Sequence, residues 1–205
     1  MEERSRIGKQ VVEQGYRIPI EEFEINKSKE EEITNLLKIS NYLSFPQYQR
    51  IKEELKLSVK EGDIEKIKIL LEEEVEFKGN IFKLDRTGKT ASLFAINHGN
   101  DNFVVPRSIS YQDEIYIVRS IIGSRESKKK IRSLEFESGS EVRTIYGNSF
   151  FLSEIEHLYI PSQLEELRSG WCSWTDKLTK IEVSSENKNF IVKEEQLLLG
   201  KSDPK

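Results

Sequence analysis

The heptapeptide IEHLYIP, residues 155–161, has an apolar spacing that recurs on both sides of it. The matching segments are IRSLEF (131–136) and LTKIEV (178–183), and the centres of the three segments are 24 and then 23 residues apart. Alternate side chains of a strand point to opposite faces, so each segment can bury its centre and the residue two positions later. A repeat at such a period predicts stacked coils, whose strands align as a parallel sheet over one apolar column.

The residues between these strands repeat as well. Val142 and Ile145 correspond to Leu164 and Leu167, and Phe150 corresponds to Cys172. We interpret these positions as the return arc of each coil, which adds further apolar side chains to the core.

Both parts of the repeat resemble the BspA-type leucine-rich repeats, whose pattern is L-x-x-I-x-I-P-x-x-V-x-x-I-x-x-x-A-F-x-x-C. Residues 155–167 follow the first part closely, and residues 142–150 follow the second part, with Ser149 at the usual alanine position. The segment 103–106, Phe-Val-Val-Pro, looks like an earlier strand that ends in the same proline. The resemblance covers residues 80–205 approximately.

Some residues depart from the pattern. Glu137 and Ser184 replace the proline in the flanking units, and SGWC (169–172) replaces the alanine-phenylalanine turn. The resemblance implies a recognition scaffold without enzymatic activity. Several members of the family are described as surface antigens or adhesins, which gives an alternative role as a surface-antigen or adhesin-like structural protein.

The first part of the chain has helical periodicity, up to about residue 77. Helices are expected over Arg4–Gln14, Glu30–Tyr42 and Pro46–Glu61. A further helix should begin at Asp63 as its N-cap. Its expected buried residues are Ile64, Ile67, Leu70 and Leu71, and its expected solvent-facing residues are Glu65, Lys66, Lys68 and Glu72. Residues 55–71 look like the helix pair of one ankyrin repeat, although a generic helical hairpin has the same spacing.

The fold class is therefore α+β: a helical region, residues 1–78, followed by a short leucine-rich-repeat solenoid, residues 79–205, with a parallel sheet and hairpin caps. A hairpin is expected over Asn80–Ile96, and a strand over Ile115–Val118. At the other end, Phe190–Val192 and Leu197–Leu199 should form a hairpin that covers the last open edge.

The composition argues against several kinds of partner. The net charge of −4 and the pI near 5.5 disfavour nucleic acid, which attracts clustered Lys and Arg. The longest apolar runs are far shorter than the roughly 20 residues of a membrane span, and the N-terminus does not resemble a signal peptide. We expect a cytoplasmic protein without membrane insertion, with the cell surface as the location that the family resemblance suggests.

No set of residues predicts catalysis, a metal site or a cofactor. The sequence GKS (200–202) lacks the upstream glycine of a phosphate-binding loop. His98, His157 and the single cysteine Cys172 have no partners at metal-ligand spacing, so Cys172 is expected as an apolar core residue and His157 as a surface residue. Four further features are interpreted as structural or solvated: Glu30–Glu32 and Glu72–Glu74 as helix faces, Arg125 with Lys128–Lys130 as a loop that could also contact an anionic partner, and Trp171 with Trp174 as turn packing.

The repeat predicts a binding surface on the face of the sheet that points away from the core. Strand alternation places Ser133, His157 and Lys180 in one row of this face, and Glu135, Tyr159 and Glu182 in the next. Tyrosine is the residue type of this set that most often anchors protein interfaces. We expect a protein partner on this face, and a homodimer through the C-terminal edge of the repeats.

Overall fold

The computed structural model describes residues 51–52, 54–56, 58–59, 63–97, 101–124, 131–150, 153–173, 175–193 and 197–200. The chain divides into two compact units, residues 1–72 and 73–205, which we describe separately. The helices expected over Arg4–Gln14 and Glu30–Tyr42 lie outside the described residues.

In the first unit, helix α4 (Ile64–Leu70) begins where the sequence predicts. The Asp63 carboxylate accepts a hydrogen bond from the backbone N–H of Lys66 at 3.1 Å, which caps the helix. Ile64, Ile67 and Leu70 are buried as expected.

The predicted position of Lys66 on the solvent-facing side is wrong, because this side chain is buried. Position 66 lies only about 40° from Leu70 around a helix of 3.6 residues per turn, so it flanks the apolar stripe. Upstream, residues 51–52, 54–56 and 58–59 are helical, and Ile51, Leu55 and Val59 are buried.

The second unit begins with strand β1 (Glu73–Phe77), which pairs antiparallel with β2 (Asn80–Asp85). The expectation that the helical region continues to residue 77, with Glu72–Glu74 on a helix face, is therefore wrong. The sequence EVEF alternates polar and apolar residues, which suits a strand. Lys78 and Gly79 have φ values of +49° and +73°, which a tight two-residue hairpin turn requires.

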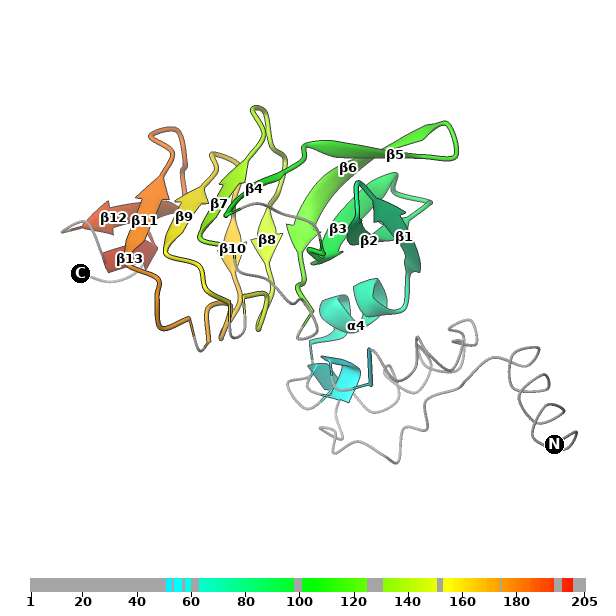
Figure 1. The fold of residues 1–205 in the computed structure, drawn as a ribbon, viewed down its shortest axis with the longest axis horizontal. Helices are drawn as coiled ribbons and strands as arrows, with labels where there is room; N and C mark the ends of the chain where they lie inside the picture. Colours follow the sequence, from blue (N-terminus) through cyan, green and yellow to red (C-terminus); the bar gives the residue numbers. More distant parts are fainter. Residues whose placement is uncertain are drawn as a thin grey trace, which may run out of the picture. The chain divides into compact units, whose positions relative to one another are not determined.

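Strands β2 and β3 (Thr90–Ala95) form the hairpin expected over Asn80–Ile96. Next come β4 (Asn102–Val105), β5 (Ser108–Tyr111) and β6 (Glu114–Ile121). Strands β5 and β6 are an antiparallel hairpin, which extends to the upper right in Figure 1.

The repeats form β7 (Ser133–Phe136), β8 (Thr144–Ile145), β9 (His157–Ile160), β10 (Glu166–Leu167) and β11 (Lys180–Val183). One parallel sheet has the order β11-β9-β7-β4, while β6, β8 and β10 follow one another in a second sheet (Figure 1). Leu134 lies opposite Leu158, and Leu158 lies opposite Ile181. The predicted equivalence of the three segments is confirmed, and the unit is a β-solenoid.

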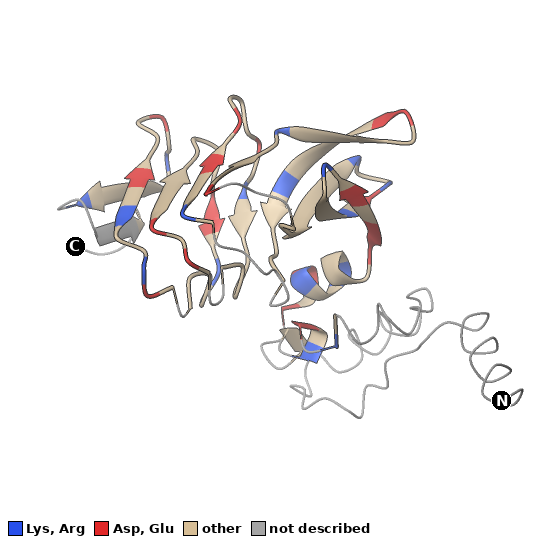
Figure 2. Cartoon of the chain, in the orientation of Figure 1, with Lys and Arg blue, Asp and Glu red and all other residues tan. Residues whose placement is uncertain are grey.

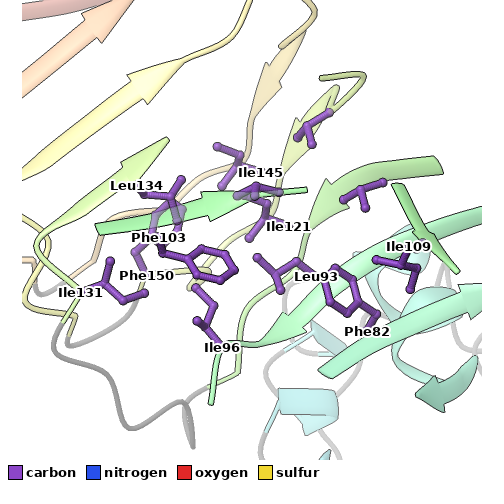
Figure 3. Close-up of a cluster of buried hydrophobic side chains, with 14 of the residues drawn as sticks. Phe82, Leu93, Ile96, Phe103, Ile109, Ile121, Ile131, Leu134, Ile145 and Phe150 are labelled. Carbon is purple, nitrogen blue, oxygen red and sulfur yellow. The ribbon is translucent and has the colours of Figure 1, made fainter. Parts of the chain in front are cut away.

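The core lies between the two sheets and continues under the first hairpins (Figure 3). Residues from every coil contribute to it, among them Phe103, Ile121, Leu134, Ile145, Phe150, Leu158, Ile160 and Leu164. Consecutive coils approach closely at Gly123, which has a φ of +60° and where an added Cβ would lie 2.3 Å from the carbonyl oxygen of Ser149. Only glycine satisfies both conditions without strain.

After β11, strands β12 (Phe190–Lys193) and β13 (Leu197–Gly200) form the expected C-terminal hairpin. This hairpin is a sheet of its own, and β11 remains the terminal strand of the parallel sheet. The hairpin therefore does not pair with β11 as a further strand, although β12 lies in contact with β11. After Val183 the chain turns away from the sheet, and the backbone of β12 pairs with β13. Among the described residues, no strand pairs with the outer edge of β11.

Candidate recognition face

The parallel sheet has an outer face, defined here by the residues that its strands turn away from the core: Asn102, Val104, Ser133, Glu135, His157, Tyr159, Lys180 and Glu182. In the register, Ser133 lies opposite His157, and His157 lies opposite Lys180. Tyr159 lies opposite Glu182. All six residues selected from the sequence thus lie on one face of one sheet.

Ser133, His157, Glu182 and Lys180 form a continuous polar network across three strands. His157 Nε2 is 2.7 Å from Glu182 Oε2, and the other oxygen of this carboxylate is 2.9 Å from Lys180 Nζ. On the opposite side of the ring, His157 Nδ1 is 3.4 Å from the Ser133 hydroxyl. The network fixes the orientation of three long side chains on the outer face.

The network changes the pKa of Glu182. The hydrogen bond from Lys180 lowers the pKa of the Glu182 carboxyl below its usual value, and the contact with His157 acts in the same direction. Glu182 therefore remains a carboxylate at neutral pH. In Figure 2, strands β7 and β11 carry acidic segments, while β9 between them carries no charged residue.

Serine, histidine and glutamate are also the residue types of a nucleophilic triad, which would make this network a catalytic site. Acyl transfer requires backbone donors that converge on a developing oxyanion. Here the N–H groups of Ser133 and His157 already donate to the carbonyl oxygens of Asp101 and Arg132. Ser133 is only 8% exposed, and its hydroxyl donates a hydrogen bond to Glu135 Oε1 at 3.4 Å. The arrangement is better suited to ordering the face than to attacking a substrate.

The outer face also carries apolar and aromatic surface. Val104 is 50% exposed and lies opposite Glu135, and Tyr159 on β9 is half-buried. A groove of about 810 Å³ begins at Tyr159 and continues along β11 to Val192 of β12. Asn102, Val104 and this groove were not predicted from the sequence. The proline after β4 was the available signal, since it marked this segment as an earlier repeat strand.

The other candidate residues have structural surroundings. Cys172 is half-buried, and burial raises the pKa of its thiol. The Trp171 ring packs edge-on against Phe150, with 6.1 Å between centroids, which confirms its predicted role in turn packing. His98, Trp174, Arg125, Lys128–Lys130, Glu30–Glu32 and the residues Lys201 and Ser202 lie outside the described residues.

Within the described ranges, no group of three or more His, Cys, Asp or Glu side chains is arranged to hold a metal ion. In the same part of the chain, no helix combines the length and the apolar character needed to cross a membrane.

No protein-family model matches the chain, and no curated protein matches it. The pneumococcal vaccine antigen PcpA is similar in structure, with 17% identity, a TM-score of 0.40, and coverage of 57% of this chain and 39% of PcpA. A leucine-rich repeat protein from Bacteroides capillosus has 15% identity and a TM-score of 0.36, over 55% of this chain and 67% of that protein. A leucine rich cell surface protein from Faecalibacterium prausnitzii has 11% identity and a TM-score of 0.27, over 63% and 59%.

This chain therefore spans well under two thirds of the length of PcpA. The fold is established by the strand register within the chain itself, in which β4, β7, β9 and β11 align in parallel. The second unit, residues 73–205, is a β-solenoid, and the repeated segments that form its coils resemble BspA-type leucine-rich repeats in sequence.

Proposed function

We propose that residues 73–205 are a non-enzymatic protein-interaction module that binds a protein ligand through the outer face of the parallel sheet. The observation that carries the proposal is the register, which gathers residues from four segments of the sequence onto one ordered surface. Solenoids commonly bind partners on such extended surfaces.

The chemistry of the face suggests which part of it contributes most to binding. Tyr159 is half-buried and lies in the row of Glu135 and Glu182, with the exposed Val104 at the far end of that row. An aromatic ring surrounded by carboxylates favours a ligand that presents an apolar group together with basic side chains. The ordered His157–Glu182–Lys180 network reduces the side-chain entropy that binding would otherwise cost.

The test compares variants of the full chain against a partner captured from cell extract and then purified. The double variant Tyr159→Ala, Glu135→Lys should weaken binding about thirtyfold or more, because it removes the aromatic anchor and reverses one charge of the row. Affinity is measured by isothermal titration calorimetry, and the thermal unfolding midpoint shows whether the fold is intact.

Two control variants change similar chemistry elsewhere. Glu165→Lys reverses an exposed charge that pairs with Arg143 on the return arcs, and Ile115→Ala removes an apolar side chain that is 65% exposed on β6. Both should bind normally. Unchanged affinity in the outer-face variant, or equal losses in the controls, would place the binding surface elsewhere.

A further inference from the structure

Strand β11 has one edge without a strand partner among the described residues, because it ends the order β11-β9-β7-β4. On its other edge, the N–H of Lys180 donates to the carbonyl oxygen of Glu156 at 3.0 Å, and the N–H of Ser184 donates to that of Ile160 at 2.9 Å. Successive residues of a strand direct their backbone groups to opposite edges. Ile181 and Val183 therefore direct their N–H and C=O groups toward the edge away from β9.

The groove described above runs along this edge. Its lining includes every residue from Thr179 to Ser185, with Tyr159 at one side and Val192 of β12 at the other. The groove thus follows the whole length of β11, and strand β12 lies beside β11 and contributes Val192 to the groove lining. Pairing between β11 and β9 is regular, and β11 contains neither proline nor a bulge, two devices that commonly protect strand edges from pairing.

The sequence of β11 is complementary to itself across a twofold axis. In an antiparallel pair of two β11 strands centred on Ile181, Lys180 of each copy lies opposite Glu182 of the other. Centring the pair on Glu182 would instead place two carboxylates opposite each other. Like charges directly opposite on a sheet destabilise the pair, and opposite charges stabilise it.

We propose that the chain forms a symmetric homodimer in which the β11 edges of two copies pair antiparallel about Ile181. In this register, the two Ile181 residues exchange both backbone hydrogen bonds, since their N–H and C=O groups point outward. On the inner side, the half-buried Ile181 side chains of the two copies lie opposite each other, and Val183 of each copy lies opposite Thr179 of the other. Each copy meets the same surface of the other, as twofold symmetry requires.

The dimer has a consequence for the outer face. The parallel sheets of the two copies become one continuous sheet, and their outer faces lie on the same side of it. Glu135 and Tyr159 stay outside the new strand pair, on β7 and β9. Glu135 does not line the groove, so the single variant Glu135→Lys should weaken partner binding and still dimerise, which makes failure of the two proposals distinguishable.

Charge exchange between Lys180 and Glu182 tests the register. Sedimentation velocity of the full chain, from roughly 1 to 200 µM at low salt, should show a concentration-dependent monomer–dimer equilibrium in the wild type. Lys180→Glu or Glu182→Lys alone should raise the dissociation constant about tenfold or more, because the symmetry places each repulsive contact in the interface twice. The double variant Lys180→Glu, Glu182→Lys should recover dimerisation, because each copy again presents opposite charges.

Two further variants separate pairing from folding. Ile181→Pro removes an N–H that points outward, so the variant should remain folded by circular dichroism and be monomeric. Arg143→Glu, which reverses a charge on the return arcs, should dimerise normally. The proposal is overturned if the wild type stays monomeric at every concentration. It is also overturned if the β11 edge binds extended peptides of other proteins but not a second copy of the chain. A double variant no better associated than the single variants would also overturn it.

Discussion

The side chain of Asn187 joins the last coil of the solenoid to the coil before it. It is 1% exposed, and its amide nitrogen donates to the carbonyl oxygens of Pro161 at 2.7 Å and Leu164 at 3.1 Å. Its amide oxygen accepts from the N–H groups of Asn189 and Phe190, both at 2.8 Å. One side chain thus bonds four backbone groups, two in the coil after β9 and two in the turn between β11 and β12.

Asn187→Ala should lower the free energy of unfolding by about 3 kcal/mol, because it removes a buried side chain and leaves several of the backbone groups bonded to it without partners. The matched control is Asn189→Ala, which removes one bond, from the Asn189 amide to the Leu164 carbonyl oxygen at 3.1 Å. This control should cost about 1 kcal/mol. Urea unfolding measures both values. Equal costs for the two variants would mean that water replaces the bonds of Asn187.

The strands show which parts of the fold the sequence could predict. Segments 131–136, 155–161 and 178–183 have nearly equal spacing, and they form the three in-register strands β7, β9 and β11. The step from Phe103 to Leu134 is 31 residues, because the β5–β6 hairpin lies within that coil. Because this step differs from the period of the other repeats, Asn102 and Val104 were not predicted to lie on the outer face.

Other features depended on contacts that no local pattern carries. The EVEF alternation of β1 is short and follows directly on a helix. The apolar periodicity of the sequence therefore predicted, wrongly, that the helix continues through these residues. The six predicted face residues could be placed because alternation along a strand is a local property. The groove at β11 could not be predicted, because it depends on where the chain turns after Val183.

Leucine-to-alanine substitutions can compare a central coil with the end of the array. Leu158 on β9 is 0% exposed, whereas Leu178, just before β11, is partly buried against the same core. Leu158→Ala should lower the free energy of unfolding by about 2–5 kcal/mol, since coils on both sides restrict collapse of the cavity. Leu178→Ala should cost less, about 1 kcal/mol. Chemical denaturation of both variants checks the order, and a reversed order would contradict the described packing.

The chain as a whole divides after Glu72, six residues before the boundary that the sequence suggested at residue 78. The difference is strand β1, whose five residues pair with β2 from Glu73 opposite Leu84 to Phe77 opposite Asn80. Val75 lies opposite Phe82 and is buried in the same core as the repeats, and the Phe77 ring packs edge-on against Phe82. By these contacts, β1 is part of the solenoid unit.

Two fragments distinguish the boundaries directly. Residues 73–205 should be soluble and unfold cooperatively, because this fragment retains β1 and its pairing with β2. Residues 79–205 should be less stable by several kcal/mol, since losing Val75 and Phe77 uncovers Phe82 and leaves β2 as an exposed edge. Thermal unfolding followed by circular dichroism compares the two, and dye binding to exposed apolar surface reports on the uncovered core. Equal midpoints would show that β1 contributes nothing to the unit, and would restore the boundary at residue 78.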